Sequence, residues 1–88
     1  VDALTNLGLI ESVSGKKQEA LENFNRATEI SQAISDPTQE ANVRYEIARV
    51  KLDLGELTES RRQIENTLNI VESLRTKVVH NAQRRVAP

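Results

Sequence analysis

The two halves of the chain match each other at a shift of 40 residues, and this match narrows the folds that the sequence can adopt. The shift places Gly15 on Gly55, small residues on small residues, and large apolar residues on large apolar residues. A unit that recurs with a period of about 20–50 residues is typical of proteins built from stacked supersecondary units. The sequence therefore predicts two similar units. The matched small residues are Gly8 with Ala48 and Ala20 with Ser60.

Turn signals divide the chain into four segments, each long enough for a helix. Good helix formers are plentiful, and no apolar–polar alternation of period two appears, so we predict an all-α fold. Gly15 and Gly55 each follow an apolar-periodic segment, where a left-handed residue commonly ends a helix. Asp36 is a preferred N-cap before Pro37, and Gln39 is placed to complete a capping box. The predicted helices cover residues 2–14, 17–34, 37–54 and the chain from Leu57 onward.

Gly8 lies inside the first predicted helix, where glycine costs about 1 kcal/mol relative to alanine. The short turn at Gly15 makes the first two helices antiparallel neighbours, so the middle of one faces the first turns of the other. Small residues at Gly8 and Ala20 would let the two backbones approach closely, with Leu7 and Phe24 interlocking around the contact. The sequence predicts that leucine at Gly8 overpacks this contact.

Composition excludes several classes of function. The 13 acidic and 12 basic residues nearly cancel, which argues against a nucleic-acid partner. Without cysteine, the chain has no disulfide, thiolate metal site or cysteine nucleophile. No run of about 18 apolar residues predicts a membrane span. His80 has no other histidine or cysteine with which to hold a metal, and no nucleophile–base set can be assembled. We therefore expect a non-catalytic protein without a cofactor.

The large, small and turn residues that recur in the two halves of the chain resemble the pattern of the tetratricopeptide repeat (TPR). The resemblance covers residues 1–74 and is stronger in the first unit than in the second. The period of 40 is similar to the long repeats of kinesin light chains and of bacterial and cyanobacterial TPR proteins. The segment DLGELTESRRQIENTLNIVESLRTKV resembles the last repeat before a caspase-like CHAT domain. The first unit matches through Leu4, Leu7, Gly8, Gly15, Ala20, Phe24 and Ala27, and the second through Ile47, Ala48, Gly55, Ser60, Ile64 and Thr67.

The resemblance implies two hairpins stacked in a right-handed superhelix, with residues 1–36 as the first repeat, residues 37–80 as the second and residues 81–88 as a tail. It implies a cytoplasmic scaffold fragment that binds a protein or peptide on a concave face. The alternatives are a structural spacer or oligomerisation element, and a peptide-sensing regulatory module. Arg44 departs from the family pattern, because a large apolar residue is expected there. The implied binding residues are Thr5, Asn6, Leu9, Asn42, Tyr45 and Arg49.

Tyr45 and Arg49 lie four residues apart, which puts them on one side of a helix. Together they could hold an acidic or planar group by bidentate pairing and stacking. The simpler interpretation, which we favour, is that Arg49 pairs with Asp53 one turn later.

The last predicted helix carries apolar residues at helical spacing and meets no glycine or proline before Pro88. We expect it to run to about Gln83, beyond the hairpin that it belongs to. Its uncovered apolar stripe predicts two-fold self-association through residues 64–82. The alternative is a frayed tail after Lys77. The predicted self-association face consists of Leu68, Val71, Leu74 and Val78.

Overall fold

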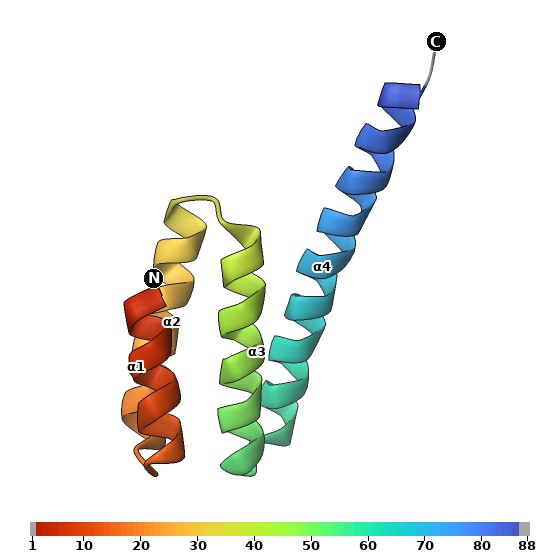
Figure 1. Ribbon diagram of the computed structural model, residues 1–88. Coiled ribbons are helices and arrows are strands. Elements are labelled where there is room, and N and C mark those ends of the chain that lie inside the picture. The colour runs from red at the N-terminus through yellow and green to blue at the C-terminus, as the bar shows by residue number, and fades with distance from the viewer. Residues whose placement is uncertain (1, 87–88) are drawn as a thin grey trace.

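Four helices account for nearly all of the chain in the computed structural model, which describes residues 2–86 and the side chains as far as Gln83. The described residues contain no strand, which confirms the predicted all-α fold. Val1 of the predicted first repeat and residues 87–88 of the predicted tail lie outside the described residues. The helices are α1 (Asp2–Val13), α2 (Lys17–Ala33), α3 (Pro37–Asp53) and α4 (Leu57–Val86) (Figure 1).

The three turns share one backbone geometry. Each holds a residue in the left-handed region: Gly15 at φ 84°, Ser35 at φ 54° and Gly55 at φ 80°. The next amide donates to the carbonyl five residues earlier, at 2.8, 2.8 and 2.9 Å, as in the Schellman motif. The two glycines were predicted to end helices and do so. Ser35 was not predicted, because serine is not a typical left-handed residue.

Replacing Ser35 by glycine is expected to stabilise the protein by about 0.5–1 kcal/mol. A residue with a Cβ atom pays about 1–2 kcal/mol in the left-handed region, and the gain is reduced because glycine has more freedom in the unfolded chain. Urea unfolding of Ser35→Gly against the parent measures the difference. Ser14→Gly is the matched control, since Ser14 precedes the first turn without a positive φ and should gain nothing.

The start of α3 follows the prediction at Asp36 and departs from it at Gln39. The Asp36 carboxylate accepts a hydrogen bond from the Gln39 backbone N–H at 3.1 Å, and Pro37 occupies the first turn. The reciprocal half of the capping box is not formed, because the Asp36 N–H donates to Ser31 O. The Gln39 side chain instead donates to Thr5 Oγ1 at 3.4 Å, which links α3 to α1.

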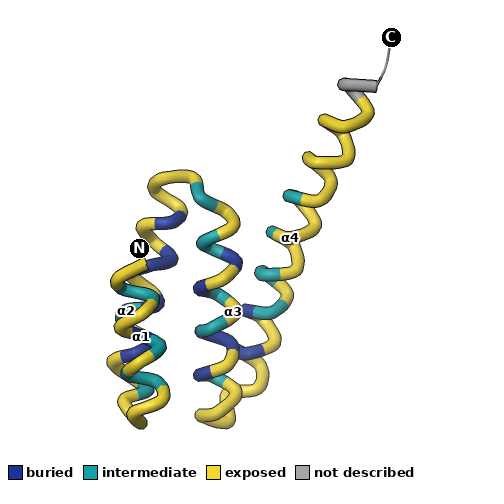
Figure 2. The backbone as a smooth tube through the Cα atoms, in the orientation of Figure 1, coloured by how far each residue is buried: buried dark blue, intermediate teal, exposed yellow. Residues whose placement is uncertain are grey.

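Each helix packs against the next one along the chain, and α1 also contacts α3 (Figure 1). The short turns reverse the direction of the chain each time, so neighbouring helices are antiparallel. Buried residues concentrate where the helices lie alongside each other, and the distal part of α4 is almost entirely exposed (Figure 2). None of the described helices is both long enough and apolar enough to span a bilayer.

The small residues within the two hairpins are buried, as predicted. Gly8 faces Phe24: a Cβ atom placed on it would lie 2.5 Å from a ring carbon of Phe24. In the second hairpin, Ser60 Oγ donates to Ala48 O at 2.8 Å, which brings α4 against the backbone of α3. The prediction for Leu7 is wrong, since its side chain is exposed and leaves Phe24 to fill the α1–α2 contact.

The main hydrophobic core lies between the hairpins as well as within them. Seven buried apolar residues of α2 and α3 form one cluster, and Leu4 and Leu9 of α1 pack against it. The interior therefore joins the two units into one body. The cluster consists of Ala20, Leu21, Phe24, Ala27, Val43, Ile47 and Val50.

Arg44 stands where the resemblance leads one to expect a large apolar residue, and it is a polar bridge between α3 and α4. Its Nε lies 2.8 Å from Glu40 Oε2, and its guanidinium donates to Gln63 Oε1 at 3.1 Å. Gln63 is buried, so this bond satisfies a side-chain oxygen that would otherwise be removed from water. The arginine at this position is therefore accommodated by a partner on the next helix.

Candidate interaction surfaces

The six residues of the predicted concave face come from the two helices that the Gln39–Thr5 hydrogen bond joins. Thr5 and Leu9 of α1 are half-buried, and Leu9 packs against the core. The other four side chains are exposed. The structure thus puts three of the exposed residues on one side of α3, at spacings of three and four residues. We call them the α3 strip: Asn42, Tyr45 and Arg49.

The ion pair of Arg49 differs from the predicted one. Arg49 lies 3.6 Å from Glu46, one turn earlier, while Asp53 lies 3.3 Å from Lys17 at the start of α2. Asp53 is the last residue on the side of α3 that packs on α2, and its carboxylate therefore lies close to that helix. The prediction of an Arg49–Asp53 pair is therefore wrong. Arg49 remains exposed, as does Tyr45 one turn earlier, whereas Glu46 is half-buried. An ion pair at 3.6 Å with one solvated member contributes little to stability.

The three side chains of the α3 strip carry groups that can form hydrogen bonds, ion pairs and stacking contacts. Asn42 can donate and accept hydrogen bonds, Tyr45 presents an aromatic ring with a hydroxyl, and Arg49 presents a planar cation. A guanidinium and a tyrosine ring one turn apart can engage a carboxylate by paired hydrogen bonds and an extended backbone by stacking. Among the described residues, no group of three metal-ligating side chains converges here or elsewhere.

The four residues of the predicted self-association face on α4 differ in their exposure to solvent. Leu68, Val71 and Val78 are exposed, whereas Leu74 is half-buried. Leu74 lines a largely apolar recess of about 240 Å³ between α4 and the start of α3, which also includes Pro37. α4 extends past Lys77, where the alternative prediction placed a frayed tail, and ends at Val86, three residues beyond the predicted end near Gln83; it is about 45 Å long.

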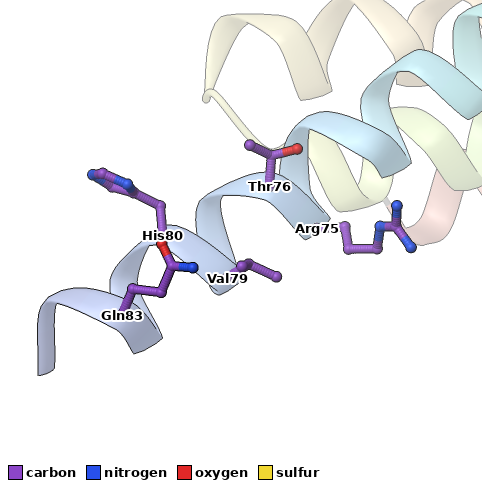
Figure 3. Close-up of a pocket in the computed structure, with 5 residues that line it drawn as sticks. All are labelled: Arg75, Thr76, Val79, His80 and Gln83. Carbon is purple, nitrogen blue, oxygen red and sulfur yellow. The ribbon is translucent and has the colours of Figure 1, made fainter. Parts of the chain in front are cut away.

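His80 lies on the distal part of α4, beside a hollow that this helix forms alone. All five lining side chains belong to α4 and project from it in different directions (Figure 3). A hollow between side chains of one helix has no opposing wall that could enclose a ligand. The exposed His80 therefore has no role in a site of the described residues.

An ion pair on the surface of α4 shifts the pKa of both of its members. Arg62 donates two hydrogen bonds to Glu59, at 2.9 and 3.3 Å. These bonds, together with the positive charge of Arg62, hold the pKa of the Glu59 carboxyl below its ordinary value, and Glu59 in turn raises the pKa of Arg62. Both groups are solvent-exposed, so the pair marks an ordinary helix surface.

Sequence reasoning missed the outer side of α1. Leu7, Ile10 and Val13 are all exposed there, although Leu7 is predicted to interlock with Phe24 in the helix contact. The signal that could have identified this side is the 40-residue shift, which pairs Leu7 and Ile10 with Ile47 and Val50 of α3, both buried against α2.

Comparison of the chain with protein-family models, with curated proteins and with solved structures finds no match.

Proposed function

We propose that this chain is a non-catalytic protein-interaction module of the TPR type, which binds a protein segment or peptide on the side formed by α1 and α3. The observation that carries the proposal is the exposure of the α3 strip beside a helix that α3 contacts directly. The common geometry of the turns at Gly15 and Gly55, and the buried small residues 40 positions apart, support a repeat architecture.

The composition of the surface favours a ligand with an acidic or planar group. In the part of the chain that the structure describes, Arg49 has one ion pair, at 3.6 Å to Glu46, and its own side chain stays exposed. Its guanidinium can therefore form a second pair at small cost. Asn42 and Asn6 supply amides that can bond to the backbone of an extended peptide. A tyrosine loses little conformational freedom on binding, which makes Tyr45 the natural contact for an apolar or planar side chain.

The double variant Tyr45→Ala/Arg49→Glu is expected to weaken peptide binding by at least about tenfold, because aromatic and arginine side chains carry much of the energy of such contacts. Peptides would be selected from a random display library on the parent protein, and their dissociation constants measured by fluorescence anisotropy.

Arg62→Glu is the matched control. Arg62 also pairs with a glutamate three residues earlier, and its side chain is 56% exposed against 63% for Arg49. This control should bind peptides as the parent does. Equal affinity of all three proteins for every selected peptide would contradict the proposal.

The second candidate function is a structural or oligomerisation element. The exposed Leu68, Val71 and Val78 on α4 favour it, since apolar side chains that recur along one helix often mark a contact with another chain. On this alternative, variants of the α3 strip leave every measured association unchanged.

A further inference from the structure

The junction between the two hairpins shows how one unit packs on the next. The side of α3 that bears Ile47 and Val50 is buried in the same cluster as Leu21 and Phe24 of α2. The opposite side of α3 bears Ala48, which is bonded to Ser60 of α4. One side of α3 therefore packs on α2 and the other on α4. The 40-residue shift shows which side of α1 corresponds to each of these two sides.

The corresponding side of α2 is fixed by two contacts with α3. Lys17 and Gln32 lie 3.3 and 3.2 Å from Asp53 and Glu40, respectively. Thr28 comes eleven residues after Lys17 and four before Gln32, which places it on the same side of the helix. Ser31 follows one turn after Thr28, and both are buried.

At the first end of the molecule, no other helix among the described residues covers the side of α1 that corresponds to the α2-facing side of α3. Leu7 is 46% exposed where its counterpart Ile47 is 3% exposed, and Ile10 is 62% exposed where Val50 is 2%. These two residues and Val13 form what we call the head face. In Figure 1, α1 and α2 overlap at one side of the molecule and α4 lies at the other.

At the other end, the side of α4 that corresponds to the α3-facing side of α2 is also uncovered. Leu68 is 58% exposed where Thr28 is 8% exposed, and Val71 is 48% exposed where Ser31 is fully buried. Both positions are more apolar than their counterparts. These two residues and Leu57 form what we call the tail face.

The two faces differ from the internal junction in a complementary way. The junction contains the Lys17–Asp53 ion pair. At the shifted positions the head face has Val13 in place of Asp53, and the tail face has Leu57 in place of Lys17. If only one of the two faces had kept its charged residue, that charge would lie against an apolar side chain of the other face. Instead both sides are apolar, so the two faces suit each other.

We propose that the head face of one molecule docks on the tail face of a second copy of this chain and reproduces the α2–α3 junction between molecules. The contact is heterologous, so a pair of molecules keeps one free head face and one free tail face, and association continues head to tail. Arg61 occupies the position of Leu21, and its aliphatic stem lies along the apolar contact with the guanidinium at the rim. None of the six residues belongs to the α3 strip, so the proposal stands apart from peptide binding there.

The test uses two variants that each remove one face, Leu7→Glu/Ile10→Glu and Leu68→Glu/Val71→Glu. Sedimentation velocity over a range of concentrations measures association. The parent chain is expected to form open-ended oligomers whose size grows with concentration. Each variant alone is expected to be monomeric, with its self-affinity lowered by at least about tenfold. Mixed together, they should form one-to-one heterodimers, because the first keeps its tail and the second keeps its head.

Val78→Glu is the control, because Val78 is exposed on α4 but lies outside the tail face. It should associate as the parent does, while Arg61→Leu should associate about tenfold more tightly. Circular dichroism confirms that each variant remains helical. A two-fold contact along α4 would instead leave Leu7→Glu/Ile10→Glu dimeric, make Val78→Glu monomeric and give no heterodimer on mixing. That result, or a parent chain that stays monomeric at its highest soluble concentration, overturns the proposal.

Discussion

Phe24→Ala is expected to reduce the free energy of unfolding by about 3–5 kcal/mol. Phe24 is the only phenylalanine of the chain, is fully buried, and belongs to the cluster that joins α2 to α3 while also facing Gly8 of α1. Its loss leaves a cavity among three helices. A chain of 88 residues is stable by roughly 4–13 kcal/mol on the usual per-residue scale, so much of the protein should unfold at moderate temperature.

Thermal and urea unfolding followed by circular dichroism measure this loss. Tyr45→Ala removes an aromatic ring of similar size from an exposed position and should cost less than about 1 kcal/mol. A similar loss of stability in both variants would show that the ring of Phe24 does not hold the helices together.

Gly8→Leu is expected to destabilise the protein by about 3 kcal/mol, at the upper end of the range for overpacking. An added Cβ atom alone would lie 2.5–2.9 Å from three carbons of the Phe24 ring, and this ring is fully buried and cannot move into solvent. Even Gly8→Ala should therefore destabilise, although alanine is better than glycine by about 1 kcal/mol in an open helix. Urea unfolding of Gly8→Ala shows whether this substitution lowers or raises the free energy of unfolding.

The double variant Gly8→Ala/Phe24→Leu separates the clash from the loss of the ring. Leucine lacks the ring carbons that approach Gly8, so alanine should be less harmful in the Phe24→Leu background than in the parent. The coupling measured by this cycle should be in the range of about 0.5–3 kcal/mol that is found for residues in contact. Additive effects of the two substitutions would contradict the proposed contact.

The helices could be predicted because their boundaries depend on local chemistry. Asp36, Pro37 and the two turn glycines act within a few residues of themselves, and the predicted ends of the first three helices lie one residue beyond the observed ones. Ser35 escaped prediction because nothing in a serine marks a left-handed residue. Its conformation is imposed by the two helices that the turn connects.

The candidate surface was only partly predictable, because exposure depends on which neighbours are present. Apolar spacing predicts that Leu7 is buried, but its side chain is exposed. The spacing shows that one side of the helix is apolar, and it does not show which element covers that side. Leu74 shows the reverse: placed with the exposed residues of α4, it lines a recess beside Pro37. The pairing of Arg49 with Glu46 depended likewise on Asp53 being bonded to α2.

The shared hydrogen-bond pattern of the three turns has a consequence for how such a chain can change in length. Each turn leaves one helix and begins the next with the same backbone conformation, whether it lies within a unit or between units. A duplicated block of forty residues could therefore be spliced in at any of these bends without new backbone geometry, and only the side chains on the two newly apposed surfaces would have to adapt.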